Sequence, residues 1–296
     1  MKITAKHITQ TLIEEKGYTP TDFCTTTINN VLNRLQYTLK KVRKTLPLKR
    51  LKETELIFEN IAFHQRRKIE GILKISIDVK DKVKVGQLSR KGYHRNILHT
   101  NALDKDQQWD VTLVPLGILE IDSAISTIVI GNSKQTSDFI VDGIAAWYEL
   151  RKAEIIHYHT IEIYLDNGPS VGSKRTQFIK RIMEFSAITG LKIHLLYYPP
   201  YHSKYNPIER VWAAVENYWN GTLLTSVEKV INTMKNIKWK NIKLIPIFVD
   251  KSYEKGIKLA KQEMEKLELF LVRKTGIPKW DVFIEPSFEM GMLFLE

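Results

Sequence analysis

Strict alternation of apolar and polar residues, interrupted by helical patterns, constrains the fold of this chain most strongly. In ILKISIDVK, Ile75, Ile77 and Val79 share one face, and IEIYLDNG repeats the alternation farther along the chain. A period of two is typical of a strand. Helical stripes cover residues 137–150 and 174–189, and LKIHLLYY indicates another strand. In this order of elements, strands come first and helices then alternate with strands. The order predicts an α/β chain with a mixed sheet flanked by helices.

The remaining patterns divide the chain into four segments. Residues 1–45 are expected to form a small helical unit, 46–70 a helical connector, 71–222 the core, and 223–296 a basic C-terminal extension packed on the core. Within the core, VKV at 83–85 resembles a return strand after a tight turn at Asp81, and the β-branched residues of 118–131 indicate strand.

The net charge points to a polyanionic partner. The 296 residues include 45 Lys plus Arg against 33 Asp plus Glu, a surplus of +12. Such a surplus favours nucleic acid ahead of an anionic membrane surface, although a lysine-rich protein without such a partner would look the same.

The number of cysteines, the spacing of the histidines and the length of the apolar runs exclude several kinds of protein and of metal site. Cys24 is the only cysteine, so an intrachain disulfide and a thiolate zinc cluster are excluded. No apolar run suggests a signal peptide or a membrane span, and we expect a protein of a reducing compartment. Among eight histidines only His157-x-His159 has suggestive spacing, and without a third ligand it is interpreted as an ordinary strand entrance.

The first segment has the outline of a helix-turn-helix. Two helical stripes are separated by Gly17-Tyr18-Thr19-Pro20, and short polar residues suited to groove contacts begin the second. A basic run that would suit phosphate contacts follows. The candidate DNA-binding residues here are Thr26, Thr27, Asn29, Asn30, Lys40, Lys41, Arg43 and Lys44. The alternative is a plain helical hairpin with a solvated basic face.

Three acids occupy special positions in this layout. Asp78 lies on the polar face of the first core strand, Asp166 ends a later strand, and Glu209 begins the helix after YYPPYHSKYNP. Each acid also has a purely structural explanation. Asp78 could be an exposed residue of an edge strand, and Asp166 could support the Asn-Gly turn that follows it. Glu209 could close a capping box with Asn206 as the N-cap. Acids at strand carboxyl ends, however, line the usual ligand crevice of open α/β sheets.

If these acids converge, they require a cation. Three carboxylates would otherwise repel one another, and oxygen ligands without Cys or a His cluster select Mg²⁺ or Mn²⁺. Two such ions would activate the attacking oxygen and stabilise the leaving one in a phosphoryl displacement. With a basic, DNA-reader-like chain, the pattern indicates phosphodiester chemistry on DNA.

These residues give the chain a resemblance to the DDE transposases of insertion sequences, of the ISAzo type, which have a ribonuclease H-like core. The resemblance rests on SIDVKDKVKVGQLSRKG around Asp78, IYLDNGPSVGSKR around Asp166 and LKIHLLYYPPYHSKYNPIERVW around Glu209. It extends more weakly over most of the chain.

The resemblance implies a metal-dependent transposase that hydrolyses a strand at the ends of its element and joins the 3′-OH to target DNA. Asp78, Asp166 and Glu209 would be the catalytic metal ligands for Mg²⁺ or Mn²⁺, with two ions expected. Beside the motifs, further candidates to shape the pocket are Asn167, Ser203 and Asn206, and further candidates for DNA contact are Lys174, Arg175, Lys204 and Arg210.

The expected partners are terminal-repeat and target DNA and further copies of the chain, without a membrane, in the cytoplasm of a prokaryotic cell with the chromosome. Two alternatives stay open: an inactive or co-opted transposase that only binds DNA, and a ribonuclease H-like nuclease that cleaves without joining.

Overall fold

A computed structural model describes residues 4–40, 51–93, 95–104 and 108–294. The chain divides into two compact units, residues 1–46 and 47–296. In the first unit, α1 (Ala5–Lys16) begins where the Thr4 side chain accepts a hydrogen bond from the His7 backbone and ends at Gly17, whose φ is +73°. Helix α2 (Thr25–Arg34) packs against it and buries Ile28. Both helices were predicted.

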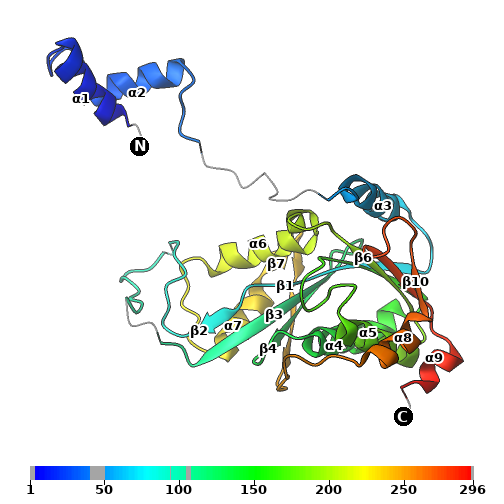
Figure 1. Cartoon of the computed structure of the whole chain (residues 1–296). Helices are drawn as coiled ribbons and strands as arrows, with labels where there is room; N and C mark the ends of the chain where they lie inside the picture. Colours follow the sequence, from blue (N-terminus) through cyan, green and yellow to red (C-terminus); the bar gives the residue numbers. More distant parts are fainter. Residues whose placement is uncertain (1–3, 41–50, 94, 105–107, 295–296) are drawn as a thin grey trace. The chain divides into compact units, whose positions relative to one another are not determined.

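The second unit is built on a mixed sheet (Figure 1) with the strand order β10-β11-β6-β5-β1-β3-β4-β9, and β2 pairs with β3. Strands β1, β3 and β4 are antiparallel neighbours, whereas β5 and β6 run parallel to β1. This arrangement confirms the predicted ribonuclease H-like fold class. The strands are β1 Ile72–Val79, β2 Val83–Val85, β3 Val111–Glu120, β4 Ser126–Gly131, β5 Thr160–Leu165, β6 Lys192–Tyr197, β9 Ile245–Val249, β10 Leu271–Arg273 and β11 Asp281–Ile284.

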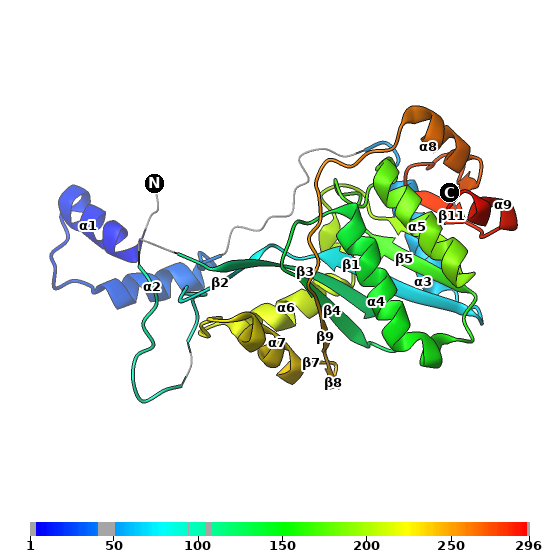
Figure 2. The ribbon, with the colours of Figure 1, turned by 90° about the horizontal axis from the view of Figure 1, so that it is seen from below.

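Helices cover both faces of this sheet (Figure 2). Helices α4 and α5 pack on one face in one apolar core, and α6 and α7 pack on the other face in a second. The helices are α3 Thr54–Arg66, α4 Ser137–Ile155, α5 Thr176–Thr189, α6 Ile208–Trp219, α7 Val227–Asn236, α8 Lys261–Glu268 and α9 Phe288–Met292, with a 3₁₀ turn over Ser203–Tyr205 and a β7–β8 hairpin (Lys238–Trp239 and Ile242–Lys243). In the described part of the chain no helix is long and apolar enough to cross a membrane.

Long-range pairing departs from the sequence prediction in three places. Strand β2 does not return along β1 but pairs antiparallel with β3. Strand β3 begins at Val111, ahead of the predicted start at 118, because β2 supplies a partner for its first residues. The C-terminal segment does more than pack on the core, since β9 joins β4 and β11 joins β6. Asp78 is therefore not on an edge strand, because β1 lies between β3 and β5.

A glycine on β3 allows α6 to approach the sheet closely. Gly117 pairs with Asp78, and a Cβ at this position would lie 2.6 Å from the Trp212 ring and 2.9 Å from the Ile208 side chain. Both neighbours are buried in α6. The small residue thus determines how near the start of α6 lies to the end of β1.

We expect Gly117→Ala to lower the free energy of unfolding by about 1–3 kcal/mol, the usual cost of overpacking a core. Gly291→Ala in α9 is the matched control, because a Cβ there meets nothing within 4 Å. Urea unfolding of both variants measures the difference. Equal stability of the two variants would contradict the close approach of α6.

Candidate active site

Asp78 and Asp166 lie at the same end of two neighbouring parallel strands. Strands β1 and β5 pair in the register Ser76 with Tyr164, so each acid follows its paired residue by two positions. Both side chains line one pocket together with Gln135 and Gly168. The two acids therefore meet although many residues separate them in sequence, because parallel strands bring their carboxyl ends to one edge.

Glu209 is positioned by a buried hydrogen-bond clamp between β1 and the start of α6. Asn206 is 1% exposed; its amide donates to the Ile77 carbonyl at 2.9 Å and its side-chain oxygen accepts from the Ser76 hydroxyl. The Ser76 hydroxyl in turn accepts a bond from the Ile208 backbone N–H at 3.0 Å. Glu209 follows in the first turn of α6.

This clamp corrects the predicted capping box. The Asn206 side chain does not cap α6, and no side chain of the local segment does. Ser76 from β1 takes that role by binding the Ile208 N–H. The sequence pattern pointed to a local cap because Asn is common at that position, but the sheet supplies a partner for Asn206.

Trp212 is a site residue that the sequence analysis did not single out for function. One turn after Glu209, its indole N–H donates to Asp78 Oδ2 at 3.0 Å. Its ring is buried in the apolar face of this helix. An indole at that position can do both, because its ring packs while its N–H finds a buried acceptor.

The three carboxyl groups act on one another electrostatically. Burial, followed by the charges of Glu209 and Asp166, raises the pKa of Asp78 to about 7. Burial also raises the pKa of Asp166. Burial raises the pKa of Glu209, and Asp166 adds to the effect while the Lys80 charge opposes it. Mutual repulsion among oxygen-only donors is the environment that a hard divalent cation relieves.

The three acids are close but not tightly packed. In the described part of the chain, the one trio of His, Cys, Asp or Glu side chains with all ligand atoms within 4.8 Å lies elsewhere, so the triad is spaced more widely than that. Lys80, which the sequence analysis did not select, lies near this site, because its charge acts on Glu209 and its ammonium binds Glu216 Oε1 at 2.7 Å.

Two predicted pocket-shaping residues make specific contacts near the acids. Asn167 Oδ1 accepts a hydrogen bond from the Ser173 backbone at 3.1 Å, which closes the loop after Asp166. Ser203 donates a side-chain hydrogen bond to Glu209. Asn206, the third predicted residue, forms the clamp described above.

The predicted DNA-contact residues fall into three groups. Lys174, Lys204 and Arg210 are exposed in the second unit, whereas Arg175 is partly buried and donates to the Ile257 carbonyl at 3.0 Å. In the first unit Thr26, Thr27, Asn29, Asn30 and Lys40 are exposed. Lys41, Arg43 and Lys44 lie outside the described residues.

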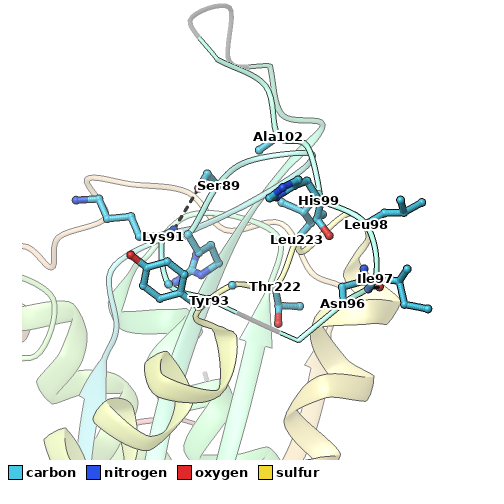
Figure 3. A pocket seen from close by; sticks show the side chains of 14 residues that line it. Ser89, Lys91, Tyr93, Asn96, Ile97, Leu98, His99, Ala102, Thr222 and Leu223 are labelled. Atoms are coloured by element: carbon cyan, nitrogen blue, oxygen red, sulfur yellow. Dashed lines mark hydrogen bonds between the residues drawn. The ribbon is translucent and has the colours of Figure 1, made fainter.

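The segment that follows β2 forms a second pocket, whose lining mixes basic and polar side chains with apolar ones such as Ile97 and Leu98 (Figure 3). Arg90, Lys91 and His99 line it together with Thr222 and Leu223. Two backbone hydrogen bonds, from Gly86 to the Leu224 carbonyl and from Gly221 to the Lys91 carbonyl, tie this segment to the end of α6. No carboxylate lines the pocket among the described residues, and sequence reasoning did not identify it.

We expect Asp78→Asn to stabilise the metal-free protein at alkaline pH. Because the pKa of Asp78 is raised from 3.8 to about 7, stability falls as the pH rises between these two values. The full penalty remains above pH 7 and is absent below the pKa of the unfolded chain. Asparagine keeps an acceptor for Trp212 without the charge. In EDTA, the free energy of unfolding should rise by at most about 4 kcal/mol at pH 8 and change little at pH 4.

Asp142→Asn is a control of opposite sign. Burial works against ionisation there, but hydrogen bonds from Lys251, Arg181 and Tyr253 lower the pKa of Asp142. Its charge therefore stabilises the fold above the unfolded pKa, and the variant should lose stability at pH 8. Denaturant unfolding at both pH values compares the variants, and a loss of stability for both at pH 8 would contradict the repulsion around Asp78.

Known proteins provide an independent comparison. A Mos1 transposase paired-end complex with the left transposon end has a TM-score of 0.47 and 12% identity, covering 77% of this chain and 68% of that chain. A Mos1 mariner paired-end complex with Mn has the same TM-score and identity and covers 64% of that chain. No curated protein matches the chain. A model of the family described as the Rhodopirellula transposase DDE domain matches residues 1–286. The predicted resemblance is thereby confirmed, and the chain belongs to this family of DDE-type transposases.

Proposed function

We propose that this transposase hydrolyses phosphodiester bonds at the ends of its element and transfers the 3′-OH to target DNA, with Asp78, Asp166 and Glu209 as ligands of two Mg²⁺ or Mn²⁺ ions. The observation that carries the proposal is the approach of three carboxyl groups, from two parallel strand ends and one helix start. Burial first, and then the charges of Glu209 and Asp166, raise the pKa of Asp78 to about 7. The donor set contains only oxygen, which suits these ions.

Several residues of the chain have distinct roles in the proposed reaction. Two bound divalent cations would supply Lewis-acid activation of the attacking oxygen and charge stabilisation at the leaving oxygen. Asp78 and Asp166 hold their carboxylates at the end of the sheet, and the clamp at Asn206 fixes the start of α6 so that Glu209 lies near them. Trp212 orients Asp78 by its hydrogen bond. Preorganised groups of this kind need little rearrangement in the reaction.

DNA is the partner that the charge of the chain favours. We assign end recognition to the helix pair α1 and α2, with phosphate contacts from exposed Lys204 and Arg210 beside Glu209 and from exposed Lys91 in the pocket after β2. Assembly of several copies on DNA, in the cytoplasm of a prokaryotic cell, completes the proposal.

Glu209→Gln should abolish the metal-dependent cleavage of element-end DNA while leaving DNA binding nearly intact. Loss of a metal ligand removes several kcal/mol of charge stabilisation, which corresponds to a decrease of at least about 100-fold in rate. Glu228→Gln is the matched control, because Glu228 also stands in the first turn of a helix but is exposed to solvent. Gel assays on DNA flanking the gene measure nicked and joined products.

The DNA products also distinguish the transposase from the two alternative functions. Nicked DNA without joined DNA would favour a nuclease that cleaves only, and binding without either product would favour an inactive DNA-binding protein. Normal cleavage by Glu209→Gln would overturn the assignment of the triad.

Lys204→Ala and Arg210→Ala should each weaken binding to DNA of any sequence and reduce the slope of log affinity against log salt by about 1. Both side chains are exposed, so folding should be unaffected. Lys152→Ala is the control, since this exposed lysine at the far end of α4 pairs with Glu149. Titrations at several salt concentrations test the contacts, and an unchanged slope for both variants would refute them.

A further inference from the structure

A second cluster of potential metal ligands is buried between α3 and the sheet, away from the three acids. His64 on α3, Glu162 on β5 and His194 on β6 each offer one ligand atom, and these atoms all lie within 4.8 Å of one another. Glu162 precedes Asp166 by four residues, a distance of about 13 Å along a strand. The proposed catalytic function does not use this cluster.

The geometry of the cluster suits a small divalent ion. The Nδ1 atoms of His64 and His194 face the same oxygen, Glu162 Oε1, at 2.7 and 3.9 Å. These distances bracket the separation of about 3.4 Å that donor atoms have around a tetrahedral zinc ion with bonds of about 2.1 Å. The side chains of Glu162 and His64 are 1% and 7% exposed, so solvent is largely excluded.

The groups around the cluster hold its members in ligand orientation. Asp281 Oδ1 lies 2.7 Å from His194 Nε2, and Asn60 donates to the other oxygen of Asp281 at 2.8 Å. A proton on Nε2 leaves the Nδ1 lone pair of His194 directed at the cluster. The Tyr164 hydroxyl donates to Glu162 Oε2 at 2.9 Å, so Oε1 is the oxygen that faces the imidazoles and the Arg67 guanidinium. Carboxylates behind ligand histidines are the usual support of zinc sites.

The two carboxylates of the cluster attract a cation, and in this structure a guanidinium takes that place. Two buried carboxylates, Glu162 and Asp281, face two imidazoles. The Arg67 guanidinium approaches the open side, at 3.3 Å from Glu162 Oε1 and 3.2 Å from His64 Nδ1. The Arg67 guanidinium also stacks on the Phe63 ring at 4.7 Å. Binding of an ion therefore requires this side chain, which is 32% exposed, to turn away from Glu162.

We propose that His64, Glu162 and His194 bind one zinc-type divalent ion, which joins α3 to strands β5 and β6. Imidazole nitrogen selects Zn²⁺ over Mg²⁺, in contrast to the oxygen-only triad. The sequence could not reveal this site, because its three ligands come from separate elements and lack any short spacing. Metal binding here is independent of catalysis, so its test does not depend on the activity of the enzyme.

The experiment uses the full chain, stripped of metal and then dialysed with Zn²⁺ in the presence of excess Mg²⁺. We expect one tightly held equivalent of zinc by elemental analysis. Co²⁺ in its place should give the intense visible absorption of tetrahedral coordination. The same stoichiometry is expected in Glu209→Gln, since the acids at the other site are not ligands of this ion.

Variants then locate the ion. His194→Gln should lose the bound equivalent, and Asp281→Asn should weaken affinity by about 10- to 100-fold. The double variant His157→Gln, His159→Gln is the matched control, because it removes two exposed histidines and should leave zinc binding unchanged.

Three results would overturn the proposal: no zinc retained by the wild-type chain, zinc retained at full affinity by His194→Gln, or zinc lost in the control. The first would leave a metal-free network of ion pairs at this position, and the others would indicate adventitious binding. Should His194→Gln fail to fold, as judged by circular dichroism, the stoichiometry and Co²⁺ spectrum of the wild-type chain decide.

Discussion

The hydrogen bonds between Ser76 and Asn206 are the interaction on which the candidate active site depends. They join the first strand of the sheet to the segment that leads into α6, and the Ser76 hydroxyl also binds the first backbone N–H of that helix. Loss of either partner would leave a buried polar group unsatisfied, at a cost of about 1–3 kcal/mol. The clamp therefore ties the position of Glu209 to the strand that carries Asp78.

The surrounding packing allows acids to remain near one another despite their repulsion. Apolar cores on both faces of the sheet hold β1 and β5 in register, and Gly117 lets α6 lie close to them. Burial and like charge raise the pKa of Asp78, so this end of the sheet is electrostatically unfavourable without a cation. Such local cost is common where a protein preorganises groups for binding or catalysis.

Two clusters of different donor chemistry lie along β5 in a chain that belongs to a DDE-type transposase family. The acids at its carboxyl end offer oxygen only, which suits exchangeable ions that act on phosphate. Glu162, four residues earlier, faces histidines from α3 and β6. Nitrogen ligands and burial suit an ion that stays in place and stabilises the fold. Strand β5 thus carries Glu162, which has a proposed structural role, and leads to Asp166, which has a proposed catalytic role.

Periodicity and composition alone determined the α/β class, most helices and strands, and the three acids, because these depend on local spacing along the chain. Only the tertiary structure decided which strands pair. It placed β2 on β3, added β9 and β11 to the sheet, and gave Asn206 a partner on β1 in place of a local cap. It also brought together His64, Glu162 and His194. The physical reason is the same in each case: these contacts join residues far apart in sequence, and their energy depends on packing that no local pattern records.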